Sequence, residues 1–304
     1  MLWGRRVVRW ALDRFVHNVR DSRTITSAVL KRQEFKLDPC ASLRSSTMHW
    51  ESLQQGPFIA ASALVFAALV VALAPRAGLE RADAFSLFGL SGVFGVFFAR
   101  VFWWCAQWLT ASPPEFSSLY SMTGGFASVG ALMGCALAWG LMFGGASTER
   151  RYAVLDLFVP AGLVALAVAR LGCLARGCDF GVPAGGPLAV TYSQPATPAV
   201  SELLMRGELA PGQQVSLAPL ALYLSCVSIA AVAIAILVSS RWRKPGRCAM
   251  LAALLYVVGR AFVESFRHPA SAPMLGEMNL NQWVMMFLSF SIMLTWFVWE
   301  RKRA

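Results

Sequence analysis

Five ionisable side chains interrupt the long apolar stretches of this sequence: Arg100, Asp156, Arg170, Arg260 and Glu264. Charged groups inside apolar segments are costly to bury and tend to be retained where they function. An arginine guanidinium stays charged and offers a planar fork that matches two phosphate oxygens. The three arginines therefore predict a site for a phosphate group within a largely apolar protein.

Each of these residues also has a purely structural interpretation. Arg170 stands near the end of its apolar stretch, so its head group can extend to water. Arg260 and Glu264 have the four-residue spacing of an ion pair on one helix face. Arg100 is compatible with packing alone, and Asp156 with a helix start. The occurrence of all three arginines together favours the binding site.

A glycine-rich run begins at Arg170 and ends at Gly181. Its glycines permit tight turns and a close approach of the backbone to a ligand. Backbone N–H groups in such turns can also bind an anion. The glycines that we expect to shape the site are Gly172, Gly177 and Gly181.

The cysteines and histidines do not form a metal-binding pattern. There are seven cysteines and three histidines, at positions 17, 49 and 268. Cys173 and Cys178 lie five positions apart in the glycine-rich run, but zinc would need ligands that the neighbouring sequence does not offer. A disulfide between them and two small packing residues remain as interpretations. We expect no metal and no cofactor.

The composition indicates what kind of protein carries these residues. Of 304 residues, 57% are hydrophobic and 14% charged, against roughly 45–50% and 25% in soluble domains. This excludes a disordered or fibrous chain and argues against a soluble enzyme. Seven apolar runs approach the roughly 20 residues that span a bilayer, and they predict an all-α polytopic integral membrane protein of about seven transmembrane helices: 57–74, 84–110, 122–145, 153–171, 218–239, 248–264 and 281–299.

The segments between these runs predict the orientation. The stretch 172–217, rich in Gly, Pro and polar residues, is expected to form a small extracytoplasmic head within a single membrane domain of residues 51–304. The segments after the first, third, fifth and seventh runs hold eleven Lys and Arg residues, whereas the other three hold three. Basic segments remain in the cytoplasm. The C-terminus is therefore predicted inside, and the head and the three arginines towards the outer face.

Residues 1–50 do not fit this orientation, because they carry ten basic residues on the side predicted to be outside. One interpretation is a helix that lies on the membrane surface. The alternative is that translation starts at Met48, which leaves a basic extension that is not native.

The ordered motifs resemble the prolipoprotein diacylglyceryl transferase family over most of residues 57–304. Ala99-Arg100 is similar to its G-A-R segment, and Asp156 to Pro160 to its D-x-x-A-P stretch. The run from Arg170 to Gly181 resembles the family signature R-x-G-x-F-x-x-G-x-x-x-G. Tyr256 to Arg267 resembles its Y-G-x-x-R-x-x-x-E-x-F-R helix, and Asn281-Gln282 the start of its last helix.

The sequence departs from the family at several polar positions. The family's H-G-G triplet reads Thr123-Gly124-Gly125, so the histidine is missing. The signature asparagine is Cys173, and the segment at 218–224 lacks the family's His, Gln and Glu. The arginines that face phosphate are kept, while groups that handle protons are lost.

The resemblance implies transfer of the diacylglyceryl group from phosphatidylglycerol to the lipobox cysteine of exported prolipoproteins, at the outer face of the bacterial cytoplasmic (inner) membrane. The implied partners are that lipid, the prolipoprotein signal peptide and the bilayer; no nucleic acid is expected. The implied catalytic residues are Arg170, Arg260 and Glu264. The proton acceptor is unassigned, and His268 is a candidate only because it is near in sequence. The implied substrate-binding residues are Arg100, Thr123, Gly124, Gly125, Gly172, Gly177, Gly181, Tyr256 and Arg267.

Two other functions remain open from the sequence. A non-catalytic paralogue would bind an anionic phospholipid or a prolipoprotein without transferring a group. A transferase on the same scaffold would use another acceptor. A transporter is less compatible, because the runs show neither an internal repeat nor paired broken helices.

Overall fold

The computed structural model describes residues 55–108, 116–119, 127–186, 188–193, 197–240, 244–271 and 274–301. All of them belong to one compact unit, residues 49–304. The basic extension of residues 1–50 and the triplet Thr123-Gly124-Gly125 lie outside the described residues. The structure therefore does not test what the sequence predicts for these two segments.

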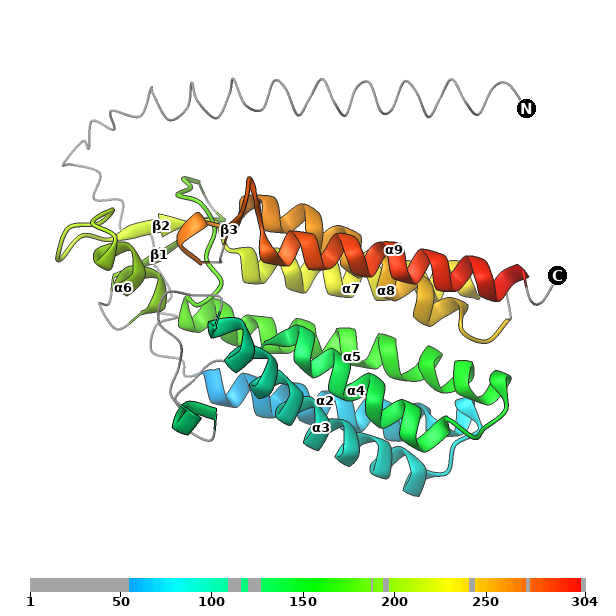
Figure 1. The fold of residues 1–304 in the computed structure, drawn as a ribbon. Coiled ribbons are helices and arrows are strands. Elements are labelled where there is room, and N and C mark those ends of the chain that lie inside the picture. The colour runs from blue at the N-terminus through cyan, green and yellow to red at the C-terminus, as the bar shows by residue number, and fades with distance from the viewer. Residues whose placement is uncertain are drawn as a thin grey trace, which may run out of the picture. The chain divides into compact units, whose positions relative to one another are not determined.

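Long helices make up most of the described chain (Figure 1): α2 (Gln55–Leu73), α3 (Arg81–Gln107), α4 (Ser128–Phe143), α5 (Thr148–Arg176), α7 (Leu220–Ser239), α8 (Arg247–Val263) and α9 (Leu280–Arg301). Six helices are long and apolar enough to cross a membrane, and α4 is a shorter apolar helix. Short 3₁₀ turns lie at Ala74–Ala77, Phe116–Leu119, Glu264–Phe266 and Pro269–Ser271. The predicted all-α polytopic membrane protein is confirmed.

Helix α5 is longer than the predicted run 153–171 at both ends. At its start, the Ser147 side chain accepts a hydrogen bond from the Arg150 N–H (3.4 Å). At its end, the Gly177 N–H donates to the carbonyl of Cys173 (2.9 Å), with Gly177 at φ 70°. The first outer turn is polar, and both outer turns are held by capping, which a search for apolar residues does not detect.

Helix α5 is also the central helix, since it contacts α2, α7 and α8. The Ser225 hydroxyl of α7 donates to the Ala167 carbonyl of α5 (2.7 Å). On the other side of the fold, α3 packs closely on α4. A Cβ at Gly134 would lie 2.2 Å from the Phe94 carbonyl oxygen, and one at Gly130 equally near that of Phe98. Small residues at this spacing allow membrane helices to approach closely.

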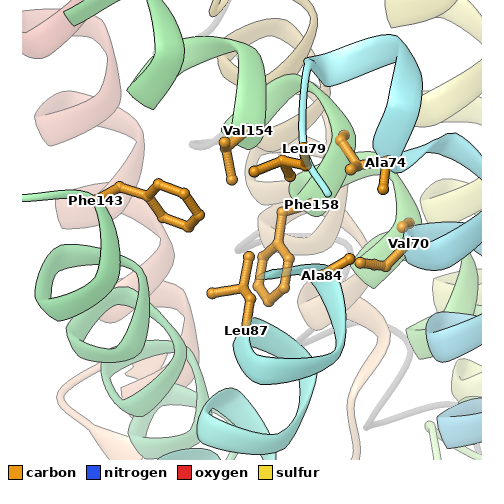
Figure 2. Packing of buried hydrophobic residues seen from close by; sticks show 10 residues of the cluster. Val70, Ala74, Leu79, Ala84, Leu87, Phe143, Val154 and Phe158 are labelled. Atoms are coloured by element: carbon orange, nitrogen blue, oxygen red, sulfur yellow. The ribbon is translucent and has the colours of Figure 1, made fainter. Parts of the chain in front are cut away.

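An apolar cluster joins α2, α3, α4 and α5 (Figure 2). Phe158 of α5 lies among Val70, Ala84 and Leu87, all of them buried. The Phe158 ring packs edge-on against that of Phe66, with centroids 4.9 Å apart. This packing fixes the position of α5 and therefore of Arg170 near its C-terminal end.

Asp156 fixes the start of α8. Its carboxylate accepts hydrogen bonds from the N–H groups of Gly246 (2.6 Å) and Ala249 (2.8 Å). An acidic side chain is stabilising at a helix N-terminus. The sequence suggested that Asp156 serves a helix start, and the structure shows that the helix served is α8 rather than its own.

The head between α5 and α7 contains one helix, α6 (Pro198–Met205), and an antiparallel pair, β1 (Val190–Tyr192) and β2 (Val215–Leu217). Thr191 lies opposite Ser216. The Tyr192 hydroxyl donates to the Leu174 carbonyl of α5 (2.8 Å). The head is thereby anchored to the end of α5.

A segment of the head, residues 180–184, joins three helix ends. The Gly181 N–H donates to the Ala218 carbonyl (3.1 Å), just before α7. The Val182 N–H donates to the Phe266 carbonyl (2.9 Å), just after α8. The segment therefore links residues that follow α5 to the start of α7 and the end of α8.

The connection from α8 to α9 is a short hairpin of β3 (Met274–Leu275) and β4 (Met278–Asn279). Asn279 and Gln282 cap α9 reciprocally. The Asn279 N–H donates to Gln282 Oε1 (3.0 Å), and the Gln282 N–H donates to Asn279 Oδ1 (2.8 Å). This capping box explains why Gln282 stands at the start of the last helix.

Replacing Gly181 by alanine is expected to destabilise the protein by about 1–3 kcal/mol, as overpacking does. An added Cβ would lie 2.5 Å from Leu220 Cδ1 and 2.8 Å from the Phe266 carbonyl oxygen. The backbone oxygen cannot move without breaking the bond from Val182. Thermal unfolding in detergent measures the effect, with Gly185→Ala as control because no atom lies within 4 Å of its added Cβ. Equal melting temperatures for the two variants would contradict the prediction.

Candidate anion-binding site

Arg170 of α5 and Asp179, nine residues later, form one half of a buried ionic cluster. Arg170 Nη1 donates a hydrogen bond to Asp179 Oδ2. Gly177 makes this possible, because its left-handed backbone ends the helix and turns the chain back. Arg170 is only 7% exposed, so its charge is removed from water.

The other half comes from the end of α8. Glu264 accepts from Arg267 Nε (2.5 Å) and Arg267 Nη2 (3.1 Å). Arg267 Nη1 also donates to Asp179 Oδ1 (3.0 Å), which joins the two halves. Arg267 thus forks between two carboxylates that are far apart in sequence.

Arg260 completes the cluster from one turn earlier in α8. Its Nε lies 3.6 Å from Glu264 Oε1, which is the four-residue pair expected from the spacing. Its Nη1 donates to the hydroxyl of Tyr256 (2.9 Å). The predicted residues Arg170, Tyr256, Arg260 and Glu264 are therefore brought together with Arg267.

The charges of this cluster do not balance. Arg170, Arg260 and Arg267 are opposed by Asp179 and Glu264, and all but Asp179 are buried. Three guanidiniums against two carboxylates leave an excess of one positive charge. The buried Nε atoms of Arg170 and Arg260 have no hydrogen-bond partner among the described residues. The cluster is therefore suited to an additional anion.

Arg100 lies on a different helix from this cluster. It is 6% exposed, and its Nε donates to the Leu119 carbonyl (3.1 Å). Its guanidinium lies 4.8 Å from the Trp103 ring centroid. These contacts match the packing interpretation more closely than a place beside Arg170.

The predicted glycines have distinct local roles. Gly172 is buried within α5. Gly177 is the left-handed end of that helix, and a Cβ there would lie 2.5 Å from Thr197 Cγ2. Gly181 begins the segment that ties the helix ends together. They shape the backbone around the cluster.

Sequence reasoning missed Asp179, which bonds two arginines of the cluster. It lay in the run already singled out, but the sequence does not show that it meets Arg267, 88 residues away. Asn279 was missed as well; its Nδ2 donates to the Glu264 carbonyl (3.2 Å). The sequence offered one signal for Asp179, namely an acidic residue close to an arginine that was expected to be buried.

His268 contacts Glu208 of the head, with Nε2 3.3 Å from Oε2. Burial lowers the pKa of His268, and Arg206 does so too, while Glu208 opposes them. This position does not by itself support the guess that His268 accepts a proton. Among the described residues, no group of three or more His, Cys, Asp or Glu could hold a metal ion.

The Asp179 carboxylate is expected to stabilise the protein above about pH 4 and to lose that contribution on acidification. Burial alone would raise the pKa of Asp179, but the Arg170 and Arg267 charges outweigh it and hold the pKa well below its usual range. A lowered folded-state pKa means that stability falls as the pH drops below the unfolded value. We expect Asp179→Asn to melt several degrees below wild type at pH 7, with a smaller gap near pH 3. A gap that stays constant with pH would contradict this.

The fold and site define a polytopic membrane protein with a buried, positively charged cluster at the head-bearing end of its helices. Residues 46–299 match the family model of prolipoprotein diacylglyceryl transferase, and the chain belongs to this family of transferases. It is 24% identical over 214 residues to phosphatidylglycerol–prolipoprotein diacylglyceryl transferase 2 of Clostridium perfringens (strain 13 / Type A). That alignment covers 69% of this chain and 77% of the relative.

Proposed function

We propose that this protein transfers the diacylglyceryl group of phosphatidylglycerol to the lipobox cysteine of exported prolipoproteins. The family and the name of the Clostridium relative support this substrate pair. The observation that carries the proposal is the buried cluster, which has one excess positive charge and two arginine Nε atoms that make no hydrogen bond within the described part of the chain. An anionic phospholipid headgroup supplies the missing negative charge.

In the reaction, the cysteine sulfur attacks the glyceryl carbon next to the phosphate. A C–S bond forms, the C–O bond breaks, and its electron pair leaves with glycerol phosphate. The thiol proton passes to an acceptor that is not assigned. Positive groups that are already in place stabilise charge as it develops on a leaving phosphate, and they also favour the thiolate form of the attacking cysteine.

We assign Arg170 and Arg260 to the phosphate, with Arg100 as a more distant helper. Glu264 orients Arg260 and Arg267 through its carboxylate. The Tyr256 hydroxyl accepts a hydrogen bond from Arg260, so its own proton is available to the lipid headgroup. Arg267 adds to the positive charge around the phosphate. The residues assigned to the entry for the lipid are Gly172, Gly177, Gly181, Thr123, Gly124 and Gly125.

The proposed location is the bacterial inner membrane, with the site towards the outer face and the C-terminus in the cytoplasm. The eleven-to-three asymmetry of basic residues supports this orientation. Exported precursors and the outer-leaflet lipid would both reach the site from that side.

The test is a vesicle assay with labelled phosphatidylglycerol and a lipobox peptide. Label appearing on the peptide cysteine, with release of glycerol phosphate, is the expected result. Replacing the peptide cysteine by serine is the matched control. Lipid binding without transfer would favour the non-catalytic paralogue, and transfer to another molecule would favour a different acceptor.

Thr123→His is expected to increase the rate of lipidation. A hydroxyl cannot accept a proton near neutral pH, whereas an imidazole can, and a general base is worth roughly 10²–10⁴-fold where proton removal limits the rate. The wild type is expected to be slow but active, since a thiol with a pKa of about 8.5 is partly ionised without a base. The comparison needs vesicles that lack any other transferase, with Thr123→Val as control. No lipidation by either wild type or Thr123→His would contradict the prediction.

A further inference from the structure

Two cysteine side chains lie beside the ionic cluster and have no part in the proposed reaction. Cys173 is in the last turn of α5, and Cys178 is the second residue after the helix. Both are only partly buried. Cys173 stands where the family signature has an asparagine, and the run from Arg170 to Gly181 resembles the cysteine-bearing version of that signature.

The helix end brings the two side chains together. The Cys178 N–H donates to the Cys173 carbonyl (3.3 Å), and the Gly177 N–H donates to the Leu174 carbonyl (3.3 Å). This pair of bonds is the Schellman motif, in which the side chains of these two positions meet. The Cys178 thiol also lies 3.7 Å from the Cys173 carbonyl oxygen.

The surroundings of the two thiols give them different reactivity. Arg170 precedes Cys173 by three residues in α5, so the two side chains lie on the same face of the helix, and a positively charged guanidinium makes a neighbouring thiol a better nucleophile. The hydrogen bond to Cys173, together with burial, raises the pKa of Cys178. The Cys173 thiol is thus suited to attack a disulfide, while the neighbouring Cys178 thiol stays protonated.

We propose that Cys173 and Cys178 form a reversible disulfide that switches the arginine cluster off. The oxidant is an external disulfide, small-molecule or protein. The Cys173 thiolate attacks it and forms a mixed disulfide, releasing one thiolate. Cys178 then gives up its proton to solvent and attacks the Cys173 sulfur, which releases the second thiolate. Two protein thiols are oxidised while the external disulfide is reduced to two thiols.

Formation of the disulfide changes the ionic cluster because a residue of the cluster directly follows Cys178 in the chain. The two sulfurs are not bonded in the structure and must approach to about 2.05 Å. Asp179 is the next residue after Cys178, and its carboxylate holds Arg170 and Arg267. Pulling Cys178 towards α5 shifts this carboxylate, and Arg170 loses the sulfur beside it. Oxidation should therefore weaken phosphate binding.

The sequence makes the bond easy to detect. Trypsin cleaves after Arg170, Arg176 and Arg206, so the two cysteines fall in separate peptides, residues 171–176 and 177–206. The full-length protein in detergent is incubated with oxidised glutathione, alkylated, digested and analysed by mass spectrometry. The expected product is the linked peptide pair, which disappears after dithiothreitol. No linked pair at any glutathione ratio would overturn the proposal.

The switch is read from lipid turnover and, separately, from binding of phosphatidylglycerol vesicles. The oxidised protein should be at least tenfold weaker in both, with recovery on reduction. Cys178→Ala should keep its activity in oxidant, while the control Cys226→Ala in α7 should remain sensitive. Disulfide formation without any change in binding or turnover would overturn the switch. This inference rests on the proposed function only for turnover: a protein that transfers nothing but loses lipid binding on oxidation would refute that function and keep the switch.

Discussion

Replacing Arg170 by alanine is expected to reduce turnover of phosphatidylglycerol by roughly 30- to 4,000-fold. This range corresponds to the about 2–5 kcal/mol lost when one member of a desolvated, hydrogen-bonded charge pair is removed. Arg170 is buried and bonded to Asp179, so the truncation removes a phosphate contact and leaves a carboxylate with less positive charge around it. Arg260→Ala should behave in the same way. Arg100→Ala should be milder, because Arg100 contacts Leu119 and Trp103.

The lysine variant tests how the arginine works. Arg170→Lys should recover little activity, since an ammonium group cannot form the two parallel bonds of a guanidinium. Initial rates in vesicles give the comparison, with Arg206→Ala as control because that arginine is exposed and pairs with Glu202 on α6. If Arg170→Ala and Arg170→Lys both turned over lipid like the wild type, the phosphate assignment would fail.

Replacing Glu264 by glutamine is expected to cost about 3–5 kcal/mol of stability, the effect of removing one partner of a buried ion pair. Glu264 is 1% exposed and bonds Arg267 through both oxygens, with Arg260 3.6 Å away. Its loss leaves three buried guanidiniums opposed only by Asp179. The melting temperature should fall by roughly 10 °C for a unit of this size. Lipid turnover should fall as well, because Arg260 and Arg267 lose their orientation.

The chain supplies a matched control for this variant. Glu202 and Arg206 have the same four-residue helical spacing, at 3.0 Å, but their side chains are 34% and 46% exposed. Exposed pairs contribute about 0–1 kcal/mol, so Glu202→Gln should melt close to wild type. If Glu264→Gln and Glu202→Gln lowered the melting temperature equally, burial of the cluster would not be the reason that Glu264 stabilises the protein.

The sequence was sufficient for the helices and for most of the cluster. Apolar runs near 20 residues predict spans directly, and ionisable residues such as Arg170 and Glu264 are conspicuous within them. The spacing of Arg260 and Glu264 predicted a contact because a helix brings those positions together. Local sequence patterns thus predict both the membrane spans and the contact between Arg260 and Glu264.

What the sequence did not show depends on contacts between distant segments. Asp179 meets Arg267 only because residues 180–184 are hydrogen-bonded to the residues after α8. Asp156 caps α8 across about 90 positions of sequence. The short strands of the head are three residues long, too brief for an alternating pattern to reveal them. The sequence also did not show that the Arg100 guanidinium lies over the Trp103 ring of its own helix.

The pairing of the buried charges has a consequence for biogenesis. A nascent helix that carries an unpaired arginine is costly to release into lipid. Here Arg170 has its counter-ion only nine residues behind it, and Glu264 lies within four residues of both Arg260 and Arg267. Each of the two helix ends can therefore leave the insertion machinery with most of its charge already compensated. The bond between Arg267 and Asp179 joins residues 88 positions apart, so the two halves of the site can meet only after α8 has been synthesised.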